Sequence, residues 1–148
     1  MPVKWEDEKF LHAAEEAIER GLDDLVGKMV DSCRQSMKQG PQTGKDYRQR
    51  FRKGGKKRAP KGVKSNKRFY VRSSAPGEYP AVQTGGLWRS IAWARAGRFK
   101  RQFGTNSLVG LWQELGTKRG LAPRPFLRMT YRKFIGKEAE VHFHEKVK

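Results

Sequence analysis

Residues 7–37 read DEKFLHAAEEAIERGLDDLVGKMVDSCRQSM, and their apolar side chains recur every three or four positions. This spacing places them on one face of a helix. The stripe consists of Leu11, Ala14, Ile18, Leu22, Leu25, Met29, Cys33 and Met37. Acids crowd the first half, Arg34 and Lys38 lie near the end, and Gly40-Pro41 follows, as the macrodipole and helix termination favour. The pattern predicts a long helix from roughly Asp7 to Met37 whose stripe faces a core.

Two hairpins are expected after this helix. Asp46–Arg52 and Lys67–Arg72 are rich in residues that favour strands and would pair with each other. Ser90–Arg95 and Lys100–Gly104 suggest two more strands, joined by a turn at Gly97.

Three shorter helices complete the predicted elements. Thr84 is a candidate cap for a short helix that runs through Leu87, Trp88 and Ile91. Asn106 or Ser107 would cap a helix that ends at Gly116, with Leu108, Leu111, Trp112 and Leu115 on one face. Pro125 suits the first turn of a C-terminal helix.

The sum is a single α+β domain over residues 1–148. We expect the long N-terminal helix to pack on a small antiparallel sheet, with short helices and a C-terminal helix around it. At 148 residues the chain is long enough for one ordinary domain. Its apolar fraction of 36% is low, which suggests that part of the chain is not packed.

The segment from Lys53 to Arg68 is basic and has no acid, with three glycines and one proline. Its eight basic residues are Lys53, Lys56, Lys57, Arg58, Lys61, Lys64, Lys67 and Arg68. Such a segment buries too little apolar surface to order itself, so we expect a flexible basic loop on a folded domain. Its bases could contact DNA phosphates or an acidic partner, or could simply be solvated.

Charge is distributed unevenly along a chain whose formal net charge is +18. Residues 1–31 hold nine acids against four bases, whereas the remainder is strongly basic. A basic field attracts nucleic acid or acidic protein surfaces. The opposite charge of the two parts could also favour head-to-tail contacts between copies.

The sequence offers no constellation for catalysis or metal binding. The six acids after residue 31 are scattered, at Asp46, Glu78, Glu114, Glu138, Glu140 and Glu145. Cys33 is the single cysteine and fits a small buried hydrophobe, while His142 and His144 stand alone near the end. We therefore expect no enzyme activity, no metal and no cofactor, and a soluble protein without a membrane span that is cytoplasmic where it is made.

Three segments resemble one known family. They are Ala75-Pro76-Gly77-Glu78-Tyr79-Pro80-Ala81-Val82 with Thr84-Gly85-Gly86-Leu87-Trp88-Arg89-Ser90-Ile91, then Gly104-Thr105-Asn106 with Trp112-Gln113-Glu114-Leu115-Gly116-Thr117, and last Ala122-Pro123-Arg124-Pro125-Phe126-Leu127-Arg128. In order and spacing they resemble the head–tail joining, or tail-completion, proteins of the neck of tailed bacteriophages. Met129-Thr130 stands where that family usually has Pro-Ala.

The resemblance implies a structural virion protein that forms a ring, hexameric in the family, between head connector and tail. Partners would be further copies of the chain, the head connector or head-completion protein, and the tail terminator or tail tube protein, with non-specific contact to duplex DNA in the channel. Candidate interface residues are Trp88, Trp112, Glu114, Arg124 and Phe126. For Glu114 we favour a local salt bridge, with an arginine such as Arg124, over a subunit contact.

Two other assignments stay open at this point. A DNA- or RNA-binding protein in its own right would fit the net charge, and a tail-terminator subunit would form a ring at the same junction. The first would bind duplex DNA as a monomer, with an affinity that falls steeply with salt.

Overall fold

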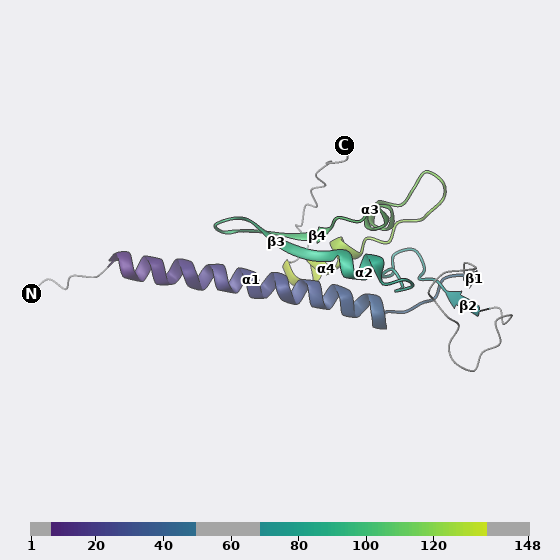
Figure 1. The fold of residues 1–148 in the computed structure, drawn as a ribbon, viewed down its shortest axis with the longest axis horizontal. Helices are drawn as coiled ribbons and strands as arrows, with labels where there is room; N and C mark the ends of the chain where they lie inside the picture. The colour runs from purple at the N-terminus through teal and green to yellow at the C-terminus, as the bar shows by residue number, and fades with distance from the viewer. Residues whose placement is uncertain (1–6, 50–68, 136–148) are drawn as a thin grey trace, which may run out of the picture.

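The computed structural model describes residues 7–49 and 69–135, and all that follows concerns these ranges. Their elements, in chain order, are α1 (Asp7–Gln39), β1 (Asp46–Gln49), β2 (Phe69–Arg72), α2 (Gly86–Ser90), β3 (Ile91–Gly97), β4 (Lys100–Thr105), α3 (Leu108–Leu115) and α4 (Phe126–Ile135). The predicted α+β arrangement, with a long N-terminal helix and a C-terminal helix, is confirmed (Figure 1).

The long helix α1 is packed along its second half only. Its 33 residues make it about 50 Å long, so it extends beyond the elements that pack against it (Figure 1). Val26 is its first buried residue, and Met29, Cys33 and Met37 continue the buried stripe. Leu11 and Ile18 remain 58% and 53% exposed, so the expectation that the whole stripe is a core face is wrong for the first turns. These turns project beyond the other elements (Figure 1).

The strands form two separate antiparallel pairs. β1 and β2 pair from Asp46 opposite Arg72 to Gln49 opposite Phe69. β3 and β4 pair from Ile91 opposite Thr105, with an irregularity between Arg95 and Gly97 next to the turn. The β3–β4 hairpin lies along α1, which fixes the side of the helix that is covered (Figure 1).

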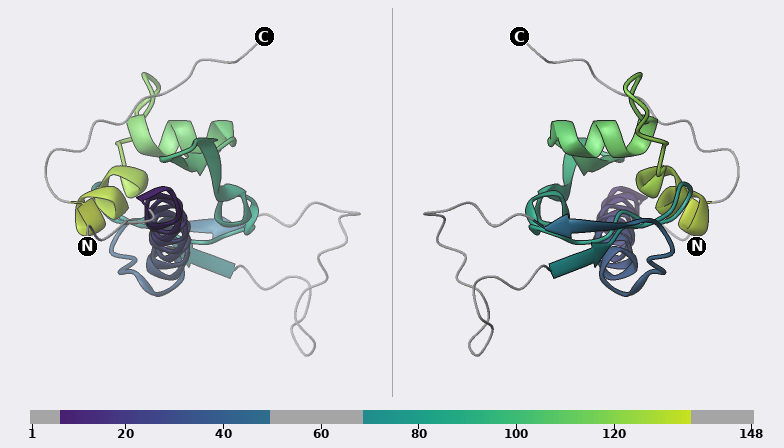
Figure 2. Two further views of the ribbon diagram at one scale, coloured as in Figure 1. Left: turned by 90° about the vertical axis from the view of Figure 1, so that its left-hand side faces the viewer. Right: turned by 90° about the vertical axis from the view of Figure 1, so that its right-hand side faces the viewer.

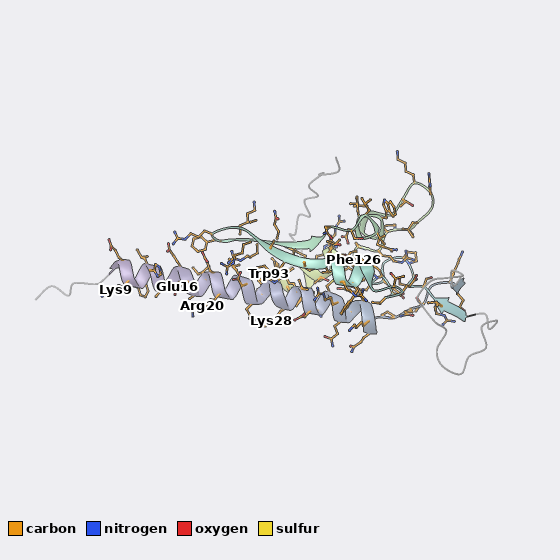
Figure 3. The ribbon with its side chains drawn as sticks, viewed as in Figure 1. Lys9, Glu16, Arg20, Lys28, Trp93 and Phe126 are labelled. Carbon is orange, nitrogen blue, oxygen red and sulfur yellow. The ribbon has the colours of Figure 1, made fainter. Side chains whose placement is uncertain are left out.

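The core is small and lies where α1, the start of β3 and α4 meet. Ile91 and Phe126 have no exposed surface, and they pack with Val30, Cys33 and Leu127. Viewed along α1, α4 lies beside the helix while α3 sits apart from it, above the hairpin (Figure 2). Phe126 lies inside this packed half, whereas Lys9, Glu16 and Arg20 mark the projecting part of α1 (Figure 3).

Helix starts differ in detail from the sequence expectation. Gly85, with a φ of 76°, is the cap position of α2, and Thr84 instead accepts a hydrogen bond from the Gly86 N–H at 3.4 Å. Ser107 is the cap position of α3 but makes no side-chain cap bond. Its own N–H donates to the Thr105 hydroxyl at 3.1 Å, so a strand residue organises the start of this helix.

Arg101 ties the hairpin to α1. Its side chain is 3% exposed and forms an ion pair with Asp23, which also pairs with Arg95. Arg101 Nη1 donates to the carbonyl oxygens of Gly97 and Arg98 at 3.1 Å, and this closes the turn. The Arg101 hydrogen bond, with help from Arg95, lowers the pKa of Asp23. Part of the acidic half of α1 is therefore neutralised within the chain.

A groove of about 910 Å³ remains between α1, the hairpin and α4. Leu22 and Leu25 of α1, Trp93 and Phe99 of the hairpin, and Tyr131 of α4 line it. The hairpin thus covers α1 without closing tightly on it, which explains why Leu22 and Leu25 are only half-buried.

Burial protects the single thiol. Cys33 has no exposed surface, and burial raises its pKa from 9.0 to about 11. At pH 8 the native thiolate fraction is therefore about a hundredfold lower than in the unfolded chain. We expect iodoacetamide to modify Cys33 at least that much more slowly in the native protein than in denaturant, as measured by mass spectrometry. Equal rates would contradict the buried position.

The same shift makes stability depend on alkaline pH. Because the folded pKa lies above the unfolded one, the contribution of Cys33 is fully present below pH 9 and is lost as pH rises towards 11. Replacement by alanine removes this dependence, so Cys33→Ala serves as the matched control in denaturant titrations.

Candidate assembly site

The three segments that carry the resemblance lie together, and Arg124 joins them. Its Nη2 and Nε donate to the Ser74 carbonyl oxygen at 2.7 and 3.2 Å. Its Nη1 donates to Gln113 Oε1 at 3.2 Å, and its backbone N–H donates to the Gln113 carbonyl oxygen at 2.6 Å. A planar guanidinium with several fixed donors suits such a junction. We call residues 73–91, 112–117 and 122–128 the motif junction.

Glu78 closes the turn at one end of the motif junction. Its carboxylate accepts hydrogen bonds from the Thr43 hydroxyl, from the Thr43 N–H at 3.2 Å and from the Ala75 N–H at 2.7 Å. The Thr43 hydroxyl contributes most to lowering the pKa of Glu78, with the two backbone donors adding to it. Gly77, with a φ of 82°, allows this turn, and its N–H donates to the Pro123 carbonyl oxygen at 3.2 Å.

Glu114 is buried and caps α4. It is 3% exposed, and its two carboxylate oxygens accept the backbone N–H groups of Leu127 at 2.9 Å and Arg128 at 3.2 Å. These donors have no partner within their own helix, because the first turn of a helix leaves its N–H groups free. Burial raises the pKa of Glu114, against the two N–H bonds and the nearby Arg128, which lower it.

The expectation of a salt bridge between Glu114 and Arg124 is therefore wrong: no ion pair joins them within the described residues. Arg124 turns to Ser74 and Gln113 instead, while Glu114 points at the start of α4. The physical reason is that a helix N-terminus offers a carboxylate two aligned donors in a place where water is excluded. Glu114 is also too buried to serve as a subunit contact.

Two glycines allow close packing in the motif junction and at its edge. Gly116, with a φ of 77°, ends α3, and a Cβ there would lie 2.7 Å from the Leu121 carbonyl oxygen. Gly110 lets α3 approach the end of β4, since a Cβ would lie 2.4 Å from Thr105 Cγ2. Thr105 is held in place, because its hydroxyl bonds to the Ser90 hydroxyl at 2.6 Å and to the Ser107 N–H.

The remaining interface candidates separate into internal and external residues. Phe126 is fully buried in the core, so its proposed interface role is not compatible with its position. Trp88 is half-buried, its Nε1 donates to the Arg34 carbonyl oxygen at 3.1 Å, and the Lys38 ammonium lies 4.3 Å from its ring centroid. Trp112, in contrast, is 48% exposed.

Trp112 belongs to an exposed apolar stripe along α3. Leu108, Trp112 and Leu115 share one face of this helix, and each is about half exposed. The opposite face carries Gly110 and Glu114, which are buried. This two-turn helix therefore presents three large apolar side chains to the outside. Neighbouring exposed apolar side chains of this kind are typical of a surface that contacts another protein.

A hollow of about 430 Å³ lies beside this helix, at the surface of the motif junction. Pro80, Val82 and Leu87 line one side, and Val109 of α3 and Arg124 line another. The lining is mostly apolar, with hydroxyl residues such as Ser73 and Thr84 at its polar parts. The hollow could take part of an apolar segment of another chain, and no Asp or Glu is among the described residues that line it.

Several sequence expectations fall outside the described ranges. The basic loop at about 53–68, His142 and His144 are among them. Within residues 7–49 and 69–135, no group of three or more His, Cys, Asp or Glu residues could hold a metal ion. The helices in these ranges are too short or too polar to cross a membrane.

Known proteins were compared with the chain in three ways. No family model matches it, and neither a curated protein nor a solved structure is significantly similar. Any assignment therefore depends on the residues and their arrangement alone.

Sequence reasoning missed Arg101 and Thr105 as organising residues. Arg101 resembles the other bases of a very basic chain, and nothing in its neighbours indicates that it would be buried against Asp23. Thr105 lies within a resemblance segment, yet its roles depend on Ser90 and Ser107, which only the fold brings to its hydroxyl.

We expect Glu114→Ala to lower the free energy of unfolding by about 2–3 kcal/mol, because it leaves two buried N–H groups of α4 without an acceptor. Glu114→Gln should cost less, since its amide oxygen still accepts one N–H. Denaturant titration measures both variants, with the exposed Lys118→Ala as control. An unchanged midpoint for Glu114→Ala would show that the cap does not stabilise the fold.

The pKa of Glu114 adds a pH dependence with a defined sign. Because the folded pKa is raised, its contribution is fully present below about pH 4.5 and is lost as pH rises through the folded value. The advantage of the wild type over Glu114→Gln should therefore grow as pH falls towards 4.5.

A pair of glycine variants tests the close approach of α3. Gly110→Ala should destabilise the protein by about 1–2 kcal/mol, since the added methyl meets Thr105. Gly27→Ala in α1 meets nothing within 4 Å and should stabilise it by about 0.5–1 kcal/mol. Thermal unfolding of both variants measures the difference, and shifts of the same sign would contradict this packing.

Proposed function

We propose that this chain is a structural subunit of a bacteriophage neck, and that it forms a ring that joins the head connector to the tail. The observation that carries the proposal is how the residues of the three resembling segments are used. The side chains of Arg124, Glu114 and Glu78 form hydrogen bonds within the chain, and these bonds hold the three segments together as a rigid unit. Residues that build a scaffold in this way suit an assembly protein better than an enzyme.

The exposed surface supports the same proposal. Leu108, Trp112 and Leu115 on α3, and Phe10, Leu11 and Ile18 on α1, present large apolar groups to the outside. Apolar groups gathered on one element mark contacts with other proteins. The chain offers two such faces on different elements, as a subunit with neighbours on both sides requires.

The mechanism would be binding and geometry. A ring of subunits with heterologous contacts closes when the rotation between neighbours permits it. Its lumen would pass DNA, and the high positive charge of the chain would favour the phosphates or an acidic face of an adjoining ring. The bases of residues 53–68 are the candidates for these contacts.

The test is the mass of the purified protein by light scattering, at low and high salt, with and without tail tubes of the phage that carries the gene. We expect a closed ring, or a monomer that becomes a ring on tail ends. Binding of duplex DNA is measured in parallel at physiological salt, where we expect weak, non-specific binding.

A monomer that does not bind tails but binds duplex DNA tightly would overturn the proposal and indicate a nucleic-acid-binding protein. Rings that attach to tails but never to the head connector would assign the chain to the tail terminator instead.

A further inference from the structure

The first turns of α1 carry an apolar face whose three large side chains are mostly exposed. Phe10, Ala14 and Ile18 follow one another every four residues, with Leu11 beside them, so they share one side of the helix. Phe10, Leu11 and Ile18 are each more than half exposed. We call these four residues the α1 face. It lies on the part of α1 that projects beyond the hairpin (Figure 1).

This projecting part is acidic. Residues 8–19 contain four acids and one lysine. Within the described residues, Glu15 is the one acid of this stretch that pairs with a base of another element, Arg98 of the hairpin turn. Glu16 contacts His12 and Arg20 on its own helix, where exposed pairs contribute little. The α1 face therefore lies in a field of negative sign.

The exposed side of α3 has the opposite character. Leu108, Trp112 and Leu115, which we call the α3 face, lie in a segment, 106–120, that contains two bases and one acid. That acid is Glu114, which is buried against α4. Lys118 and Arg119 follow α3 directly, are exposed, and make no ion pair within the described residues. The α3 face, which is apolar and lies beside bases, is therefore complementary in charge to the α1 face, which is apolar and lies beside acids.

Within one copy the two faces cannot meet. The α1 face is at one end of the long axis, whereas α3 sits over the other half of the molecule (Figure 1). The end-on views also place α3 apart from α1 (Figure 2). Within the described residues neither face has a partner, and a second copy supplies both matching surfaces.

We propose that the α1 face of one copy docks on the α3 face of the next. This deepens the proposed function, on which it rests for the closure of the ring, by naming the surfaces that join the copies. The contact is helix on helix, and the small Ala14 between Phe10 and Ile18 leaves room for the indole of Trp112. Because the two surfaces differ, the contact is heterologous and repeats from copy to copy.

The experiment uses two double variants of the whole chain. Leu11→Ser/Ile18→Ser removes the α1 face, and Trp112→Ser/Leu115→Ser removes the α3 face. All four side chains are exposed, so both variants should fold, which circular dichroism checks. Phe99→Ser, an equally exposed apolar residue on the hairpin, is the matched control.

Sedimentation velocity at high micromolar concentration measures association. We expect the wild type and Phe99→Ser to associate alike, and each double variant to weaken association by at least about thirtyfold, as the loss of a central apolar anchor does. Raising the salt should weaken wild-type association as well, since opposite charges flank the contact.

Mixing the two double variants gives the decisive result. Each keeps the face that the other has lost, so an equimolar mixture should form a dimer that grows no further. A mixture that stays monomeric while the wild type associates, or double variants that associate like the wild type, would overturn the inference. A wild type that remains monomeric at every concentration would overturn it too.

These outcomes are separate from those of the proposed function. Rings on tail ends that persist in both double variants would refute this contact and leave the neck assignment intact. Self-association through the two faces without any binding to tails would support this contact and refute the neck assignment.

Discussion

The buried carboxylate of Glu114 is the interaction on which the rest of the packed half depends. It accepts the first free N–H groups of α4, and so fixes where that helix begins. From this start Phe126 enters the core against Cys33 and Ile91, and Thr130 comes within 3.2 Å of the Tyr79 hydroxyl. Burial of a charge is costly, and the raised pKa of Glu114 records that cost. The cost is offset because α3, α4 and the 73–91 segment can all pack once α4 is held.

Polar and apolar residues of the motif junction have opposite roles. Arg124, Glu78 and Ser74 form hydrogen bonds to backbone groups of this region, which hold irregular stretches that have little core of their own. Trp112 and its neighbours on α3 face outward on that locked frame. A rigid frame with apolar groups already in place loses little conformational entropy when a partner binds. This division of roles is what the assembly proposal is based on.

The sequence predicted the elements whose signals are local. The apolar spacing of α1, the glycine that ends α3 at Gly116, and the strand pairing of 46–49 with 69–72 are all present in the structure. It failed where a contact between distant segments decides the outcome. Leu11 matches Met29 in spacing but has no element opposite it. Glu114 was assigned to an arginine because bases are abundant nearby in the sequence, whereas only the fold brings the start of α4 to its carboxylate. Phe126 is a large apolar residue that the sequence can assign to the core or to an interface, and only the fold shows that it lies in the core.

The projecting end of α1 is held to the rest of the fold by few contacts, whereas the remainder of the helix is packed against other elements. Glu19 is the residue nearest the N-terminus that Arg101 holds to the hairpin, through its backbone carbonyl oxygen at 3.4 Å, and a Cβ at Gly21, two residues further on, would meet nothing within 4 Å. Unwinding the turns before Glu19 would break the Glu15–Arg98 pair, and no side chain of residues 8–18 is fully buried. Local opening there is therefore far easier than global unfolding. The packing of the described residues places almost no demand on Phe10, Leu11 or Ile18, so these positions can change with little cost to the stability of the fold.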